Sequence, residues 1–152
     1  MVSALYKKAG ADLEADLRTL KMTPRISASA ATVATAEKTT SYTGKIRGPV
    51  MIVDNIGDPV DPDPYKLAYQ HTVTSAGNGD LLRLAWIRSA RHGNQSVAER
   101  LAGFTKLIER LDTGHWSDTS PEAMSALAKE IGKASDLDLG PVRFVSDEPH
   151  GA

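Results

Sequence analysis

Residues 48–64 read Gly-Pro-Val-Met-Ile-Val-Asp-Asn-Ile-Gly-Asp-Pro-Val-Asp-Pro-Asp-Pro, and residues 81–93 read Leu-Leu-Arg-Leu-Ala-Trp-Ile-Arg-Ser-Ala-Arg-His-Gly. Each stretch is an apolar run that ends in a turn. The run at 49–56 is rich in β-branched residues, which predicts a strand buried on both faces, as in a parallel sheet. Residues 81–88 predict a second strand. An acidic turn therefore follows the first strand, and a histidine turn follows the second.

The segment between the two strands predicts a helix. Asp63 is expected to be its N-cap, with Pro64 at the first helical position, and Gly77–Gly79 to end it. Helical spacing predicts a buried stripe of Tyr65, Ala68, Tyr69, Thr72, Val73 and Ala76. A strand–helix–strand unit makes the strands parallel, so both turns open on one carboxyl edge. Open α/β sheets bind their ligands at that edge.

Further helices flank this unit. Residues 1–23 predict one helix, and residues 30–38 a short helix, with a loop as the alternative. Ser96 and Glu99 form a capping box, which predicts a helix start, and Gly114 ends that helix. Its expected buried face is Val97, Leu101, Phe104, Ile108 and Leu111.

The C-terminal part predicts one more helix. It begins at Pro121 and ends at Gly132, with a buried stripe of Met124, Leu127, Ala128 and Ile131. Residues 141–145 are expected to be extended. We divide the chain into a helical segment (1–47), a core with both turns (48–116) and a C-terminal helix with its tail (117–152).

Composition excludes several classes of function. The chain has 152 residues and a formal net charge of −1, which gives no electrostatic reason to expect nucleic acid or an anionic membrane as a partner. Its lack of cysteine excludes disulfides and thiolate metal sites. The histidines outside the second turn have no metal-ligand spacing, so no cofactor or metal is expected. We expect a soluble chain without a signal peptide, of unknown localisation.

Asp58 and His92 are the candidate catalytic residues. A carboxylate that accepts a hydrogen bond from an imidazole fixes the ring tautomer and stabilises the imidazolium, as in a catalytic triad. The alternatives are that Asp58 only shapes a Gly-Asp-Pro turn and that His92 is an exposed loop histidine. Asp61 is the nearest rival acid, whereas Asp54 lies in the first strand and Asp63 is explained as a cap.

These residues resemble the C-terminal part of an α/β-hydrolase. That family often writes its acid turn Gly-Asp-x-Val-x-Pro, and residues 57–62 read Gly-Asp-Pro-Val-Asp-Pro. The family places its histidine after the last strand and before the last helix, as His92 stands before helix 96–112. The resemblance is closest to secreted-type actinobacterial members, whose last helix runs into a segment like 110–116. It covers residues 1–145 and implies a serine hydrolase of esters or amides.

Two departures limit this resemblance. Arg91 stands where the family usually has glycine, and the chain has no Gly-x-Ser-x-Gly elbow. We expect the elbow and the earlier strands to lie upstream of Met1, so that the isolated chain is inactive unless another chain or an upstream segment supplies the serine. The alternative is a non-catalytic hydrolase remnant that forms homo-oligomers, or docks on another sheet, through its open sheet edge.

Overall fold

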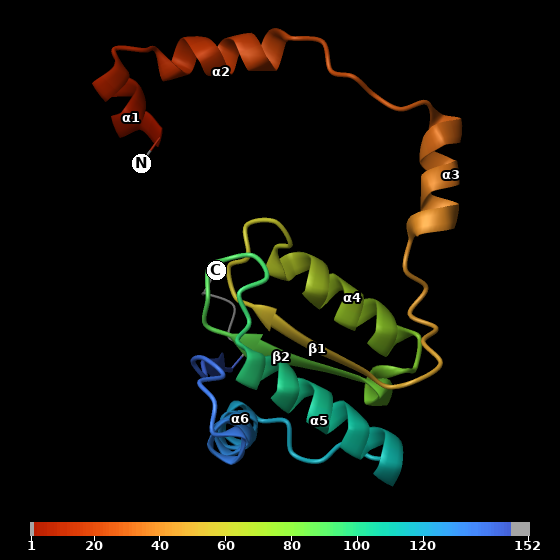
Figure 1. Ribbon diagram of the computed structural model, residues 1–152. Coiled ribbons are helices and arrows are strands. Elements are labelled where there is room, and N and C mark those ends of the chain that lie inside the picture. The colour runs from red at the N-terminus through yellow and green to blue at the C-terminus, as the bar shows by residue number, and fades with distance from the viewer. Residues whose placement is uncertain (1, 147–152) are drawn as a thin grey trace. The chain divides into compact units, whose positions relative to one another are not determined.

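The structure is a computed structural model that describes residues 2–146 (Figure 1). The chain divides into two compact units, residues 1–41 and 42–152. It is a mixed α/β protein, with six α-helices and one three-stranded sheet in the described residues. The α/β prediction is confirmed at this level.

The first unit contains three helices: α1 (Val2–Ala9), α2 (Leu13–Met22) and α3 (Ala30–Thr40). The prediction of a single helix over residues 1–23 was wrong. Gly10 has a positive φ of 66°, and Asp12 then caps a new helix by accepting a hydrogen bond from the backbone of Ala15. The predicted helix from Ala30 is confirmed. None of these three helices contains a buried residue.

The second unit is built on the predicted parallel pair of strands. Strand β1 (Val50–Asn55) pairs with β2 (Leu82–Ile87) in a register that runs from Val50 opposite Leu82 to Asn55 opposite Ile87. The extended C-terminal segment forms a short third strand, β3 (Phe144–Val145), which pairs antiparallel with β2. The strand order is β1-β2-β3, so β1 lies at one edge of the sheet.

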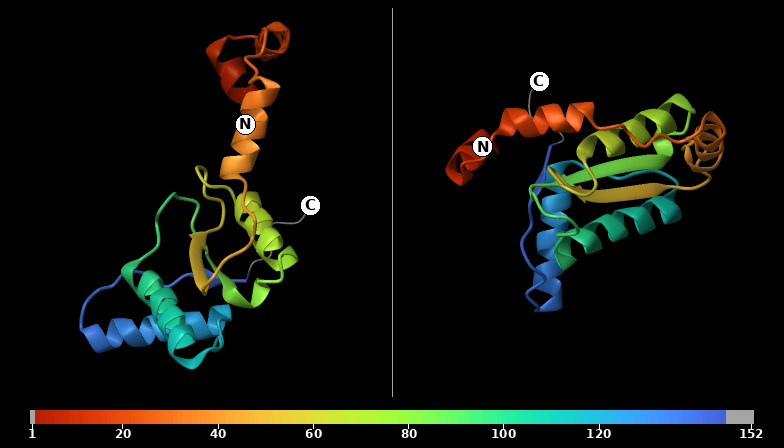
Figure 2. Two further views of the ribbon diagram at one scale, coloured as in Figure 1. Left: turned by 90° about the vertical axis from the view of Figure 1, so that its right-hand side faces the viewer. Right: turned by 90° about the horizontal axis from the view of Figure 1, so that it is seen from above.

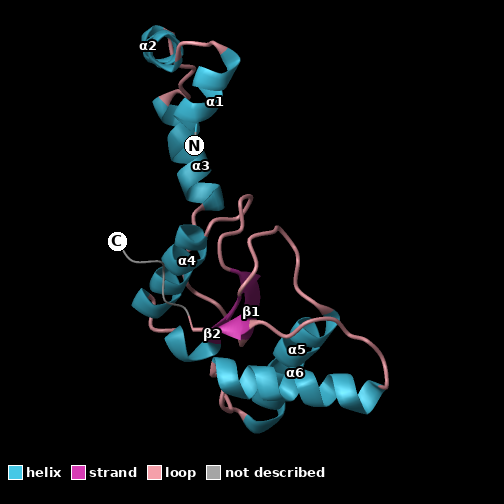
Figure 3. Cartoon of the chain, turned by 90° about the vertical axis from the view of Figure 1, so that its left-hand side faces the viewer, coloured by secondary structure: helices cyan, strands magenta, loops and turns pink. Residues whose placement is uncertain are grey.

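Helices cover both faces of this pair. Helix α4 (Asp63–Ser75) and the short helix η1 (Gly79–Leu81) connect β1 to β2, and α5 (Val97–Thr113) and α6 (Pro121–Ser135) follow β2. Figure 1 and the view from above in Figure 2 place α4 on one face of the strands and α5 on the other. Figure 3 shows the loops that follow the two strands.

The main core lies on the α5 and α6 side of the sheet. Its buried members come from β2, β3 and both helices: Ala85, Ile87, Ala98, Ala102, Met124, Ala128 and Phe144. The predicted stripe of α6 is confirmed, since Met124 and Ala128 are fully buried and the other two members pack against the core. The helix continues past Gly132 to Ser135, so the predicted end was wrong.

The prediction for the buried face of α5 was wrong. All five predicted residues are 39–62% exposed: Val97, Leu101, Phe104, Ile108 and Leu111. The helix instead buries Ala98, Glu99, Ala102 and Gly103. A Cβ atom at Gly103 would overlap the side chain of Val53 in β1. Small residues therefore bring the backbone of α5 close to the sheet, and its large apolar residues face away.

The stripe predicted for α4 was right for Val73, which is fully buried, and wrong for most of its other members. The buried residues of α4 are Lys66 and Val73, whereas Tyr65, Ala68 and Ala76 are exposed and Tyr69 and Thr72 are half-buried. The N-cap is Pro62 and makes no side-chain hydrogen bond, so Asp63 is not the cap. The carboxylate of Asp63 accepts a hydrogen bond from the backbone of Gly57 instead. Asp63 thus stabilises the preceding turn.

Candidate active site

The acid turn follows β1 directly. Gly57 has a positive φ of 76°, a conformation that glycine adopts without strain, and it redirects the chain toward Asp58. The Oδ1 atom of Asp58 accepts hydrogen bonds from the backbone N–H groups of Val60 at 2.8 Å and Asp61 at 3.0 Å. The Asp58 side chain is 1% exposed. The turn therefore buries one carboxylate and holds it in a fixed orientation.

The histidine turn follows β2 at the same edge of the sheet. His92 Nδ1 lies 2.9 Å from Oδ2 of Asp58 and 3.2 Å from Oδ1. Since an ionised carboxylate can only accept, Nδ1–H is the donor, and Nε2 is the ring nitrogen left to accept a proton. The imidazole is 59% exposed. The structure thus brings the two predicted residues together across the ends of neighbouring parallel strands.

The surroundings of Asp58 keep its carboxyl group ionised. Burial by itself raises the pKa of Asp58, but the hydrogen bonds from the backbone of Asp61 and Val60 and from His92 outweigh burial and lower that pKa to about 2. At neutral pH the group is a carboxylate. An ionised, immobilised acceptor opposite Nδ1–H is the arrangement that orients an imidazole as a general base.

A cluster of charges around Lys66 supports the acid turn. The Lys66 ammonium group is buried and lies 3.2 Å from Asp54, 3.7 Å from Asp61 and 4.0 Å from Asp63. It also donates to the backbone carbonyl of Asp61 and lies 5.9 Å from the ring centre of Trp86. Asp61, the rival acid, and Asp54 in β1 are therefore both in ion pairs with a lysine.

The sequence analysis did not single out Lys66, because the apolar stripe predicted for α4 does not include it. The available signal was its spacing, three residues after Asp63 and five after Asp61. Lysine at position i+3 from an aspartate on a helix can pair with it, and the structure makes that pair.

The helix that follows the histidine turn begins with the predicted capping box. Ser96 Oγ accepts from the backbone of Glu99 at 3.1 Å, and the Glu99 carboxylate accepts from the backbone of Ser96 at 2.7 Å. Glu99 is fully buried and also binds Arg143, with Oε2 2.9 Å from its Nη2. The same Arg143 nitrogen donates to the carbonyl of Asn94 at 2.6 Å. One arginine thus ties the β3 segment to the histidine turn.

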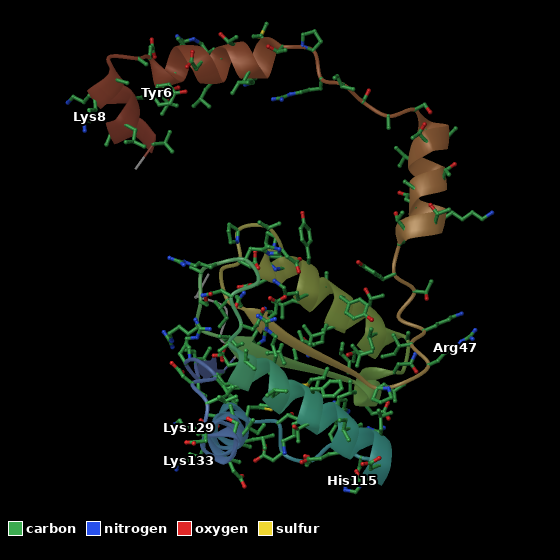
Figure 4. The ribbon with its side chains drawn as sticks, in the orientation of Figure 1. Tyr6, Lys8, Arg47, His115, Lys129 and Lys133 are labelled. Atoms are coloured by element: carbon green, nitrogen blue, oxygen red, sulfur yellow. The ribbon has the colours of Figure 1, made fainter. Side chains whose placement is uncertain are left out.

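The remaining histidines lie away from this pair. His71 is exposed on α4, and His115 follows the C-terminal end of α5, where its ring contacts the carbonyl of Thr113 (Figure 4). His150 lies outside the described residues. Over residues 2–146 no group of three or more histidine, aspartate or glutamate side chains could hold a metal ion.

Arg91, the departure from the expected glycine, does not block the pair. Its side chain is exposed, and its carbonyl oxygen accepts a hydrogen bond from Asn55 Nδ2 at 2.7 Å. In the described part of the chain, the side-chain hydrogen bonds of His92 go only to Asp58, and no serine hydroxyl reaches the ring. Residues 2–146 therefore hold an acid and a base without an adjacent serine nucleophile.

Comparison with known proteins gives one informative match. Over 129 residues the chain is 33% identical to a protein of Xanthobacter agilis named o-phthalyl amidase. The match covers 84% of this chain but 28% of that protein, so the chain spans little more than a quarter of the length of this relative. Models of protein families give no match, and neither do solved structures.

The similarity to an amidase indicates a hydrolase-type enzyme among the relatives of this chain. Among the described residues, no helix is both long and apolar enough to cross a membrane.

Proposed function

We propose that this chain is the acid-and-base portion of a serine hydrolase of the α/β-hydrolase type, with Asp58 and His92 as its catalytic residues. The observation that supports the proposal is the hydrogen bond of 2.9 Å between His92 Nδ1 and the buried carboxylate of Asp58. The two residues stand in the order acid then histidine at the ends of adjacent parallel strands. That order matches the α/β-hydrolase arrangement, in which the serine comes first.

The proposed chemistry is acyl transfer. His92 Nε2 takes the proton from a serine hydroxyl as that oxygen attacks the substrate carbonyl, and then gives the proton to the leaving group. Asp58 stays ionised and stabilises the imidazolium that forms in between. A water molecule, activated by the same imidazole, then releases the acyl group. The serine belongs to a segment outside this sequence, in line with the short span of the match to the amidase.

The name of the relative favours an amide as the substrate. We therefore place the substrate in the class of small amides or esters, with o-phthalyl amides as the first compounds to assay.

The test uses the chain together with the polypeptide encoded in frame upstream of it. We expect the combination to hydrolyse an o-phthalyl amide and either part alone to be inactive. His92→Gln and Asp58→Asn are expected to lower kcat by about a thousandfold or more. His71→Gln, which changes an exposed histidine of α4, is the matched control. Full activity of His92→Gln would overturn the proposal.

A fluorophosphonate probe gives a second measurement. Such probes label activated serines, and we expect no labelling of the isolated chain because no serine hydroxyl bonds to His92 in the described residues. Labelling of the isolated chain would show that a nucleophile lies within these 152 residues.

A second candidate function is a non-catalytic interaction module. Two observations favour it: β1 is an edge strand, and the large apolar residues of α5 are exposed. Exposed edges and apolar patches promote association between chains. Light scattering after size exclusion tests this function, and a monomer at every concentration would contradict it.

A further inference from the structure

Asn55 connects the acid turn to the histidine turn. It is the last residue of β1 and is fully buried. Its Nδ2 atom donates to the carbonyl oxygen of Arg91 at 2.7 Å. Arg91 directly precedes His92, and Asp58 follows Asn55 by three residues. This hydrogen bond therefore links the backbone next to His92 to the end of the strand that precedes Asp58.

Asn94, two residues after His92, is held by Arg143 and by Ser89, but the tip of the histidine turn itself is exposed. Arg91, His92 and Gly93 are exposed, and Gly93 has a positive φ of 61°. The imidazole is more than half exposed, so packing alone does not hold it against Asp58. Gln95 also reaches β1, but its two hydrogen bonds are long, at 3.4 Å each. The amide of Asn55 is thus the shortest side-chain link between the turn and β1.

The chemistry at position 55 fits a dedicated donor. Oδ1 of Asn55 is buried and accepts no hydrogen bond from the described residues. A buried amide oxygen without a donor is unfavourable, and an apolar side chain of similar size avoids that cost. Only a side chain with an N–H or O–H group can bind the carbonyl of Arg91, however. The cost of burying Asn55 Oδ1 without a donor is therefore tied to the hydrogen bond that Asn55 Nδ2 gives to the carbonyl of Arg91.

We infer that Asn55 is a positioning residue that keeps the His92 imidazole on the carboxylate of Asp58 by binding the carbonyl of Arg91. It does not touch the reacting atoms. Its value for catalysis rests on the proposed function, but the positioning itself is a property of this chain alone. The inference can therefore be tested without any turnover.

The test is a double-mutant cycle on the pKa of Asp58, measured by carbon-detected NMR of the isolated chain. His92→Ala removes one of the interactions that lower this pKa, so the pKa should rise above about 2. If Asn55 acts through His92, Asn55→Ala raises the pKa by a similar amount. In the His92→Ala background, Asn55→Ala should then raise it no further.

Asn78→Ala is the matched control. Asn78 Nδ2 donates to the carbonyl of Gly44 at 2.8 Å, which is a similar amide-to-backbone bond at the other end of α4. We expect this variant to lower the free energy of unfolding while the pKa of Asp58 stays at about 2. The control separates loss of a hydrogen bond in general from loss of this bond.

Asn55→Leu provides a second variant that keeps the side-chain volume but has no donor. We expect long-range ¹⁵N spectra to show His92 as the Nδ1–H tautomer in the natural chain and as a mixture in this variant. An unchanged tautomer and an unchanged Asp58 pKa would overturn the inference. Equal pKa effects with and without His92 would also overturn it, as would unfolding of both Asn55 variants, because Asn55 would then stabilise the fold rather than the turn.

These outcomes are separable from those of the proposed function. Suppose that Asn55→Ala raises the pKa of Asp58 only when His92 is present, but no hydrolysis depends on His92. This result would refute the proposed hydrolase function and leave the positioning role of Asn55 intact. Hydrolysis that survives Asn55→Ala, with Asp58 still at a pKa of about 2, would refute the positioning role alone.

Discussion

Replacing Glu99 by alanine should destabilise the chain strongly. The carboxylate is fully buried and accepts hydrogen bonds from the backbone of Ser96 at 2.7 Å and from the backbone of Arg143 at 2.8 Å. It also binds the Arg143 guanidinium at 2.9 and 3.1 Å. The backbone donors of Ser96 and Arg143 lose their partner at a cost of about 1 kcal/mol each, and the unpaired arginine adds about 1 kcal/mol. We expect a total loss of about 3 kcal/mol.

The measurement is urea unfolding followed by circular dichroism. With a slope of about 1.5 kcal/mol per molar urea, a loss of about 3 kcal/mol lowers the midpoint by about 2 M. Glu99→Gln should lower the free energy of unfolding somewhat less than Glu99→Ala because it keeps the side-chain volume. It still destabilises the chain, because both carboxylate oxygens accept hydrogen bonds and the NH₂ group that replaces one of them would face donors. Glu130→Gln, an exposed change on α6, should shift the midpoint by less than about 0.3 M.

The partner variant sharpens the test. Arg143→Met leaves a fully buried carboxylate without its cation, so it should cost at least as much as Glu99→Ala. The double variant should be more stable than the sum of the two single losses predicts. A midpoint for Glu99→Ala that matches the Glu130→Gln control, or strict additivity in the double variant, would refute the reasoning.

Three further predictions concern other parts of the second unit. Gly103→Ala should destabilise the chain by about 1–3 kcal/mol because the new methyl group overlaps Val53 of β1. Gly132→Ala in α6, where a Cβ atom meets open space, should instead stabilise the chain by about 0.5–1 kcal/mol, and thermal unfolding compares the two variants. The stability that Asp58 contributes should be present above its ordinary pKa of 3.8 and be lost as the pH falls through about 2, so the difference in melting temperature between the natural chain and Asp58→Asn should shrink over that range. Lys66→Met should cost about 3 kcal/mol in urea unfolding because it leaves the aspartates of its cluster unpaired, against less than about 0.5 kcal/mol for the exposed Lys129→Met.

Local signals in the sequence predicted the two parallel strands, the start of α5 and the approach of the two turns, but not the break between α1 and α2. The capping box at Ser96 and Glu99 fixed a helix start, because its two reciprocal hydrogen bonds need only residues three apart. The apolar runs before Asp58 and His92 predicted parallel strands, and parallel strands bring their following turns to one edge.

The packing could not be predicted in the same way. Helix α5 carries two stripes, one of large apolar residues and one of small residues around Ala102 and Gly103, and hydropathy selects the large one. In the structure the stripe of small residues is buried, because only small side chains let the helix backbone lie this close to the sheet. Lys66 and Asn55 were missed for a related reason. Their roles depend on partners that sequence periodicity does not pair with them, such as the carbonyl of Arg91.

The close seating of α5 has a consequence for the imidazole itself. Because the backbone of α5 at Gly103 lies against Val53 of β1, a side chain at this position would push the helix away from the strand. His92 stands five residues before the first turn of α5 at Val97, and the other end of its loop is continuous with β2. The position of this imidazole would then depend on Gly103, a residue that has no side chain.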